Sequence, residues 1–291
     1  MGAGLIQELT KKINALNTTK KIVRVTELST LSKLGGYRQR AESAVAYYTT
    51  ILKSLQQLSN TISFGAGEGT EENIAILMVT SNRGLCGAYN LEVFKQIDKL
   101  LTTLPTDANK EFIVIGNQGQ RYLERKEQTI IQTINEPLEA INLEQATILT
   151  TELIRNIRSG RFDSIYVVFT QYLNAVQSQA QFTKIYPDLP EAEVATVTDE
   201  LSGVLDFEEQ DDELEYQLLE NYLCGLIYSM LLYSVASEYC ARRIAMKAAN
   251  ENTSERLDES IALRKKSRLQ QATGELIDII TGAQIIKEEK E

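Results

Sequence analysis

Apolar residues recur at helical spacing along the first 59 residues, and no proline interrupts them. The spacing alternates between four and three residues and resumes further along on a shifted face; these positions are Leu9, Ile13 and Leu16, then Val25, Leu28 and Leu31. Residues 3–59 are therefore predicted to be helical, with a bend or interruption at Gly35-Gly36, where each glycine costs about 1 kcal/mol of helix stability. At about 1.5 Å per residue such a helix is roughly 80 Å long, so it must protrude from a domain or pair with another helix.

Residues 212–287 are predicted to form a second long helix, because they contain no proline and a single glycine before the final turns. An apolar stripe near the end has the 3- and 4-residue spacing of a coiled coil, and it consists of Leu269, Ala272, Leu276, Ile279, Ala283 and Ile286. Lys265 and Lys266 fall where this stripe would continue, and lysines there suit exposure to a partner. We expect the two terminal helices to pair as an antiparallel coiled coil, with an ordinary helical bundle as the alternative.

The middle of the chain alternates short apolar runs with helical stretches. Buried strands are predicted at 74–80, 111–116, 129–134 and 164–170, with an edge strand at 178–187 and helices at 91–104, 118–126 and 143–160. This alternation indicates a mostly parallel sheet covered on both faces, which is a Rossmann-like α/β domain inserted between the long helices. We expect residues 1–60 and 212–291 to form the coiled-coil shaft, and residues 61–211 to form the globular domain with an acidic, flexible connection at 191–213.

Composition excludes several classes of function. The chain has 291 residues, 30 Lys and Arg against 40 Asp and Glu, a net charge of −10, and no histidine. The lack of histidine excludes histidine-based triads, proton relays and histidine metal sites, and the acidic balance disfavours nucleic acid as a partner. The first 60 residues differ, with nine basic and three acidic side chains, which suggests that they face other surroundings than the rest.

The three cysteines, Cys86, Cys224 and Cys240, lie too far apart for a metal motif and are interpreted as reduced core thiols of a cytosolic protein. No secretory signal is recognisable at the N-terminus. The chain also lacks an uninterrupted run of about 18 apolar residues, so we expect no direct membrane insertion.

No residue pattern indicates catalysis or a cofactor. The glycine-rich residues 65–70 precede a predicted strand and are interpreted as a linker, since a phosphate cradle needs the order strand, loop, helix. Gly116 and Gly119 do follow a strand, but a third glycine and an acidic partner are missing, which leaves only a weak nucleotide-binding alternative. Ser81 has no histidine base, and the acidic pairs lie in loop-like stretches. We therefore expect no catalytic residue, no cofactor and no metal.

The stretch after the first predicted strand carries a distinctive motif. Residues 80–90 read T-S-N-R-G-L-C-G-A-Y-N, which resembles the S-D-R-G-L-C-G-G-x-N signature of the gamma subunit of rotary ATP synthases. Asn82 replaces the acidic residue of that pattern, and Ala88 replaces its second glycine. Gly84 and Gly87 are expected to permit a tight turn from strand to helix. The positions that match the signature are Ser81, Arg83, Gly84, Leu85, Cys86, Gly87 and Asn90.

The resemblance extends along nearly the whole chain. Residues 237–252 resemble the family's S-E-x-x-A-R-M-x-A-M-x-x-A-T-x-N, and residues 268–283 resemble its R-Q-x-x-I-T-x-E-L-x-E-I-x-x-G-A ending. In this family the terminal helices form a coiled-coil shaft with an α/β domain at its foot, and the shaft sits inside an alpha3-beta3 head. The resemblance therefore implies a non-catalytic rotor shaft that couples ATP hydrolysis or synthesis in the head to rotation.

The resemblance also implies partners. They are the alpha and beta subunits of the catalytic hexamer, an epsilon-like subunit, and a membrane ring or other membrane machinery at the foot, which places the chain at the cytoplasmic face of the cell membrane. Lys20, Lys21, Arg24 and Arg268 match shaft positions, and the resemblance implies that they pair with acidic loops of the beta subunits. Solvated cations on a coiled coil are the alternative for each of them.

Departures from the family pattern concentrate on the shaft. Leu269 stands in place of a glutamine, residues 264–266 (R-K-K) in place of Y-N-K, and residues 23–30 in place of K-A-M-x-M-V-A. These changes suggest a divergent paralogue in a repurposed motor without proton translocation, like the ATP-synthase-like complexes of wall-less bacteria (mollicutes), one of which is tied to gliding motility. An ordinary proton-driven synthase, a passive coiled-coil scaffold and a nucleotide-binding α/β enzyme remain as alternatives.

Overall fold

The computed structural model describes residues 2–59, 71–174, 176–187 and 212–288. The helices are α1 (Gly2–Ser59), α2 (Tyr89–Thr103), α3 (Asn117–Arg125), the 3-10 helix η1 (Leu138–Ala140), α4 (Leu143–Arg158) and α5 (Asp212–Glu288). The strands are β1 (Asn73–Val79), β2 (Asn109–Ile115), β3 (Ile130–Ile134), β4 (Ser164–Tyr172) and β5 (Ser178–Tyr186). Every predicted helix and strand is present within a few residues of its expected limits.

Contacts divide the chain into two compact units. The helix-pair unit consists of Met1–Thr30 and Arg243–Glu291, and the sheet unit consists of Leu31–Arg242. Segments of α1 and α5 thus belong to the sheet unit, because they pack on the sheet. The expected domain limits near residues 60 and 211, the linker at 65–70 and most of the connection at 191–213 lie outside the described residues, so these limits stay predictions.

The sheet unit is built on five strands in the order β3-β2-β1-β4-β5. The first four strands run parallel, and β5 pairs antiparallel with β4 at one edge. This arrangement confirms the predicted mostly parallel sheet with an added edge strand. Because parallel strands end at the same edge of a sheet, the segments that follow β1, β2 and β4 lie close together there.

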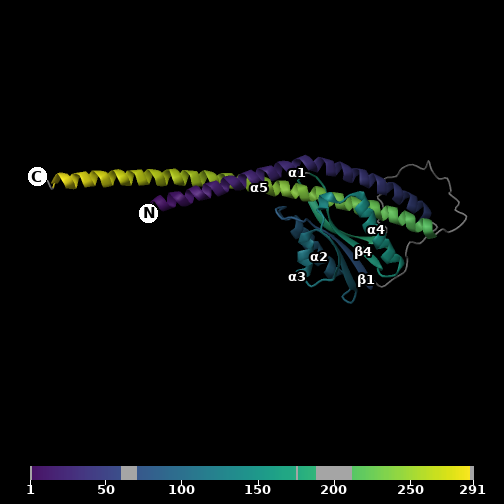
Figure 1. Ribbon diagram of the computed structural model, residues 1–291. Helices are drawn as coiled ribbons and strands as arrows, with labels where there is room; N and C mark the ends of the chain where they lie inside the picture. The colour runs from purple at the N-terminus through teal and green to yellow at the C-terminus, as the bar shows by residue number, and fades with distance from the viewer. Residues whose placement is uncertain (1, 60–70, 175, 188–211, 289–291) are drawn as a thin grey trace. The chain divides into compact units, whose positions relative to one another are not determined.

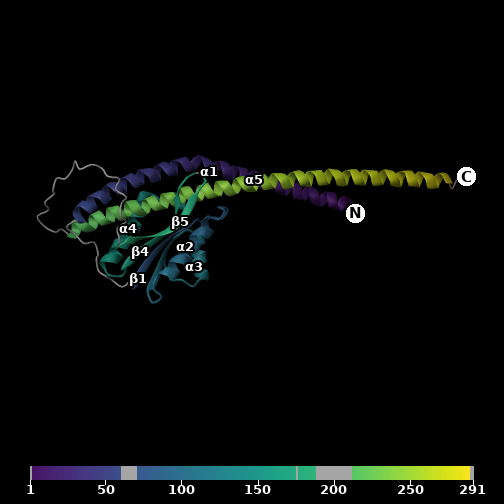
Figure 2. The same ribbon diagram turned by 180° about the vertical axis from the view of Figure 1, so that it is seen from behind.

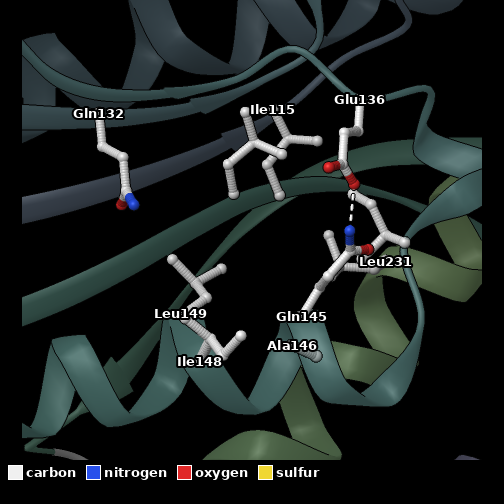
Figure 3. A pocket seen from close by; sticks show the side chains of 10 residues that line it. Ile115, Gln132, Glu136, Gln145, Ala146, Ile148, Leu149 and Leu231 are labelled. Atoms are coloured by element: carbon white, nitrogen blue, oxygen red, sulfur yellow. Dashed lines mark hydrogen bonds between the residues drawn. The ribbon is translucent and has the colours of Figure 1, made fainter.

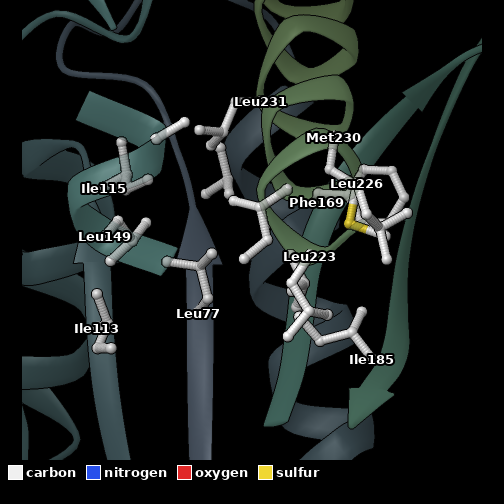
Figure 4. Close-up of a cluster of buried hydrophobic side chains, with 14 of the residues drawn as sticks. Leu77, Ile113, Ile115, Leu149, Phe169, Ile185, Leu223, Leu226, Met230 and Leu231 are labelled. Carbon is white, nitrogen blue, oxygen red and sulfur yellow. The ribbon is translucent and has the colours of Figure 1, made fainter. Parts of the chain in front are cut away.

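Both faces of the sheet are covered, which explains the continuous apolar run in β1. Ile76 and Met78 pack in a core with α2 and α3, whereas Leu77 and Val79 pack in a second core with α4 and α5. Figure 4 shows this second core, in which side chains of the strands and of α4 meet those of α5. Successive residues of a strand point to opposite faces, so a strand that is buried on both faces must be apolar throughout.

The part of α5 in the sheet unit is a core helix. A stretch within Tyr216–Ala283 is long and apolar enough to cross a membrane by length and composition, with a mean hydropathy of 1.3, but 72% of it is buried inside the protein. Gly225 lies where α5 meets α1, and a Cβ atom there would be 2.7 Å from Tyr48 Cβ. The apolar character of this stretch is therefore accounted for by the sheet and by the α1 segment that covers it.

In the helix-pair unit, α1 and α5 lie side by side and run in opposite directions (Figures 1 and 2). This confirms the predicted antiparallel pairing. The buried positions of α1 keep one heptad-like face, and they are Leu9, Ile13, Val23 and Thr30. The buried positions of α5 are Met246, Thr253, Leu257, Ser260 and Ser267. The α5 side of the contact is thus rich in short polar side chains, which allow two helices to approach closely.

On α1 the first predicted stripe is confirmed at Leu9 and Ile13, which are buried, but the second stripe on α1 and the stripe on α5 are wrong in phase. On α5, Leu269, Leu276 and Ile279 are 70%, 60% and 67% exposed, and Ala272 and Ala283 are exposed as well. The side chain of Ile286 lies outside the described residues.

The same error affects α1, where Val25, Leu28 and Leu31 are about half to two-thirds exposed and no shift of the buried face occurs. Lys265 and Lys266 are exposed too, so they do not interrupt the contact, which runs through Ser260 and Ser267. Apolar spacing identifies a stripe, but it does not distinguish a stripe buried within the chain from one exposed on the surface.

Candidate functional site

The turn that follows β1 is held by a compact set of hydrogen bonds. The Ser81 main-chain N–H donates to Asn90 Oδ1 at 3.1 Å, and Ser81 Oγ donates to the Arg83 carbonyl at 2.7 Å. Asn90 Nδ2 donates to Ser81 Oγ at 2.8 Å and to Cys86 Sγ at 3.3 Å. Since Asn90 lies in the first turn of α2, these bonds tie the start of that helix to the end of β1. The structure thus brings Ser81, Cys86 and Asn90 together.

The backbone of the turn differs from the expectation. Gly87 has a φ of 59°, in the left-handed region that favours glycine, but the second residue with positive φ is Leu85, at 66°. Gly84, which was expected to shape the turn, has no such φ, and nothing lies within 4 Å of a Cβ placed on it. A leucine in this region costs of order 1–2 kcal/mol. The side chain of Leu85 is 72% exposed, so its own packing does not offset that cost.

Asn82, which stands where the family has an acidic residue, both donates and accepts a hydrogen bond. Its Nδ2 donates to the Asn135 carbonyl at 2.9 Å, and its Oδ1 accepts from the Asn117 main-chain N–H at 2.9 Å. An amide has both a donor and an acceptor, whereas a carboxylate only accepts. Asn82 therefore joins the segments after β2 and β3 to the turn after β1.

Restoring the acid with Asn82→Asp is expected to lower the free energy of unfolding by about 1–2 kcal/mol, because the carboxylate loses the bond to Asn135 and faces its carbonyl oxygen. Urea unfolding measures the change. Asn14→Asp, on an exposed position of α1, makes the same change of charge and is expected to have little effect. Equal stability of Asn82→Asp and the parent chain would contradict the assigned contacts.

The start of α3 is already occupied by the protein's own groups. The N–H of Asn117 donates to Asn82 Oδ1, that of Gln118 to the Ser81 carbonyl at 3.2 Å, and that of Gly119 to Thr80 Oγ1 at 2.9 Å. A phosphate at a helix N-terminus needs such N–H groups free. The geometry therefore argues against the nucleotide site that Gly116 and Gly119 left open.

The turn also meets α5 through a buried ion pair. Glu238 Oε1 lies 2.6 Å from Arg242 Nη2, and the two side chains are only 4% and 13% exposed. Arg242 also approaches the Arg83 carbonyl at 3.5 Å. Glu238 and Arg242 belong to a stretch that resembles the family, but the sequence predicts no role for either side chain. The available signal was a Glu and an Arg four residues apart within an otherwise apolar helical stretch.

Burial raises the pKa of Glu238 above its ordinary value of 4.5, although Arg242 and Arg83 oppose the shift and Glu139 adds to it. The native state therefore binds this proton more readily than the unfolded state does. Its contribution to stability should grow as the pH falls through the raised pKa towards 4.5, the reverse of an ordinary paired carboxylate. Unfolding free energies of the parent chain and of Glu238→Gln between about pH 7 and that value test this. A difference between the two that does not change with pH would contradict it.

Cys86 is placed for structure and not for reactivity. Its thiol is 2% exposed, and burial raises its pKa, which disfavours the thiolate that reacts. Cys224 and Cys240 are buried as well, and none of the three forms a disulfide within the described residues. The interpretation of the three as core thiols is confirmed for burial.

The four cations expected to contact a partner lie in the helix-pair unit. Lys21, Arg24 and Arg268 are exposed, and Lys20 is half-buried. Lys20 and Arg24 are four residues apart and so share a face of α1. Within the described residues no hydrogen bond or ion pair of these four side chains is found. Their charges are thus available to another molecule, and their role as contacts stays a prediction.

A small apolar pocket of about 170 Å³ opens between β3 and α4 in the sheet unit. Figure 3 shows its isoleucine and leucine side chains, with Glu136 and Gln145 hydrogen-bonded to each other. Gln132, the third polar residue of the lining, donates to Glu152 Oε2 at 3.1 Å, and the lining holds a single acid and no hydroxyl, thiol or amine side chain. No group of three potential metal ligands occurs in the described part of the chain. The pocket therefore has no catalytic set of residues.

Comparison with known proteins gives consistent matches along the chain. Among curated proteins, the chain is 28% identical to the ATP synthase gamma chain of Arthrobacter sp. (strain FB24), covering 97% of this chain and 98% of the relative. It is 23% identical to the sodium-ion-specific ATP synthase gamma chain of Acetobacterium woodii, with the same coverage.

Solved structures agree in fold. A chain of the cryo-EM structure of the Euglena gracilis mitochondrial ATP synthase (OSCP, F1 and c-ring, rotational state 3) superposes with a TM-score of 0.69 at 18% identity, covering 99% of this chain and 97% of that one. A chain of the Tetrahymena thermophila mitochondrial ATP synthase central stalk and c-ring gives a TM-score of 0.58 at 18% identity, covering 78% and 99%. The ATP-synt family model, described as ATP synthase, matches residues 5–286. The chain therefore belongs to the ATP synthase family.

Proposed function

We propose that this chain is the non-catalytic central shaft of a rotary ATP synthase or ATPase, the counterpart of the gamma chains to which it is similar. The observation that carries the proposal is the match over residues 5–286, which includes both terminal helices and the inserted α/β domain. The antiparallel pairing of α1 and α5 supports it, since an axle needs a stiff, proline-free helix pair.

In this role the chain couples ATP hydrolysis or synthesis to rotation without binding nucleotide itself. The shaft presents a different surface to each of three catalytic beta subunits, and each surface stabilises a different conformation. Because a ligand or partner shifts an equilibrium only by its differential affinity for the two states, rotation changes the nucleotide affinity of each beta subunit in turn.

The exposed faces of the helix-pair unit supply two kinds of contact to the alpha and beta subunits. Arg24 and Arg268, with Lys20 and Lys21, would pair with acidic loops. The exposed apolar side chains at the end of α5, among them Leu276, Ile277, Ile279 and Ile280, would be covered by the head. The stripe that was first interpreted as the internal seam thus becomes the surface for the partner.

Partners of the sheet unit are proposed from the named neighbours, whose structures contain a c-ring. A membrane ring, and an epsilon-like subunit, would attach around the sheet unit, and the chain would be peripheral at the cytoplasmic face of the membrane. The coupling ion is either the proton or sodium, because one relative is named as sodium ion specific.

A repurposed motor without ion translocation is the second candidate. It is favoured by the departures on the shaft, where Leu269 replaces the family's glutamine and is 70% exposed. The genes beside that of this chain separate the two: a neighbouring ring-subunit gene supports a synthase, and unrelated membrane genes in its place support a motor with another task, such as gliding.

The proposal is tested by purifying the chain with its candidate alpha and beta subunits and attaching a probe to α3 in a surface-tethered complex. We expect one copy of this chain per hexamer and rotation of the probe during ATP hydrolysis. Failure to assemble would overturn the proposal, and a static probe on an active complex would support a passive scaffold. Calorimetry of the isolated chain with ATP, GTP and NAD tests the enzyme alternative, for which we expect no tight binding.

A further inference from the structure

Helix α5 carries a polar row near the C-terminal end of its buried segment. Ser234, Glu238 and Arg242 are spaced by four residues and lie on one face of the helix, and Ser237, three residues after Ser234, lies at the edge of that face. Ser234 and Ser237 are fully buried, and Glu238 is 3% exposed. The buried stretch before them is mainly apolar, from Leu219 to Leu232.

The row meets the ends of two strands. The Thr170 main-chain N–H, in β4, donates to Ser234 Oγ at 3.2 Å, and Ser237 Oγ donates to the Thr170 carbonyl at 3.3 Å. One turn further, Arg242 approaches the Arg83 carbonyl in the turn that follows β1, and it is paired with Glu238 at 2.6 Å. The same face of α5 is thus bonded to β4 and lies against the turn that follows the adjacent strand β1.

A third element completes the contact. The ring of Tyr239, next to the row, lies 5.4 Å from the ring of Tyr37 in α1, centroid to centroid. Tyr37 Oη in turn donates to the Glu139 carbonyl at 3.2 Å, in η1. Within the sheet unit, the segments of both long helices, α1 and α5, are therefore connected to segments at the carboxyl edge of the sheet by directional contacts.

Apolar packing and polar bonding have different mechanical effects. Apolar packing is non-directional, so a helix that slides or turns slightly on a sheet can exchange one apolar contact for another. Buried hydroxyls and charges tolerate no such exchange, because each displaced group would lose its partner without access to water. A row of four such residues therefore fixes both the rotation of α5 about its axis and its position along that axis, relative to the ends of the strands.

We propose that this polar row is a torsional joint, which locks the α/β domain to α5 so that turning the helix turns the domain with it. The inference rests on the proposed rotor function and adds the place where torque leaves the shaft. The four residues of the row are positioning residues. The main-chain carbonyl of Arg83 connects the signature turn to the joint through Arg242.

The test uses the full chain first. The double variant Glu238→Leu/Arg242→Met replaces both charged side chains by apolar ones of similar size, so the buried space stays filled and the directional contacts are lost. Hydrogen exchange at the amides of residues 81–90 should become about tenfold faster, which corresponds to a loss of about 1.4 kcal/mol of local stability. Ser237→Ala should act in the same direction, and Ser237→Thr, which keeps a hydroxyl, should restore slow exchange. Lys126→Met, which removes the surface ion pair with Asp98, is the matched control and should leave residues 81–90 unchanged.

The second measurement uses the assembled complex, stalled without nucleotide, with a probe on Arg121→Cys in α3. The angular fluctuation of the probe should be at least about twice that of the parent in Glu238→Leu/Arg242→Met. Unchanged fluctuation, or exchange that rises equally through the whole sheet unit, would overturn the joint and leave the row as ordinary fold stabilisation. A parent complex whose probe never rotates under ATP would refute the rotor function instead, which the exchange data do not test.

Discussion

Gly225→Val should lower the free energy of unfolding by about 3 kcal/mol, because the contact of α5 with α1 in the sheet unit has no room for a side chain. A single Cβ atom would already lie 2.7 Å from Tyr48 Cβ and 3.2 Å from the ring of Tyr47, and valine adds two methyl groups. Tyr48 Cα lies 3.4 Å from the same Cβ position, so a rotation of the tyrosine side chains does not relieve the clash.

Gly35→Ala is the matched control for that substitution. Nothing lies within 4 Å of a Cβ atom at position 35, and the residue is in the interior of α1. Alanine there should raise the free energy of unfolding by about 0.5–1 kcal/mol through helix propensity alone. Urea unfolding monitored by circular dichroism measures both variants, and a Gly225→Val chain as stable as the parent would contradict the close approach of the two helices.

Arg24→Glu/Arg268→Glu should slow association with the alpha and beta subunits by about tenfold or more at low salt. Both side chains are exposed on the helix-pair unit and have no partner among the described residues, so reversal of their charge would repel the acidic loops that we propose as their partners. The effect should shrink with added salt, because the Debye length falls from about 10 Å at 0.1 M to 3 Å at 1 M.

The control for this pair is Arg121→Glu/Arg125→Glu, which makes the same change of charge on exposed positions of α3. Association rates are measured by surface capture of the labelled chain at several salt concentrations. Equal slowing of association by both double variants would mean that only the total charge matters, and it would contradict a specific contact of Arg24 and Arg268 with the partner.

The strands and short helices were predictable because each is specified locally. A strand such as β1, buried on both faces, must be apolar throughout, and the alternation of such runs with helical stretches has few solutions other than a parallel sheet. The long helices were predictable from the absence of proline. These features depend on residues that are close to one another in sequence, so one sequence is enough to predict them.

The phase of the helix pair was not predictable for a physical reason. Leu276 and Ile279 are more apolar than Ser260 and Ser267, yet the serines are the buried ones. Short side chains allow α1 and α5 to lie side by side, while the larger apolar residues are exposed on the surface that we propose another subunit covers. A ranking by hydrophobicity alone therefore assigns the interface to the wrong face.

The candidate site was predictable in part. The signature identified the turn and its Ser81 and Asn90, but not the left-handed Leu85 or the double role of Asn82. The contact with α5 was missed because Glu238 and Arg242 are separated from the turn by about 150 residues, and no local pattern indicates that β1 ends beside them.

The occupied start of α3 has a consequence for how the whole assembly senses energy supply. The α/β domain keeps the architecture that many dinucleotide enzymes use, but an amide and a hydroxyl of its own loops occupy the anion position. A fall in cellular ATP or a rise in ADP therefore finds no receptor at this position. In the proposed assembly, the start of α3 therefore contributes no response to nucleotide levels.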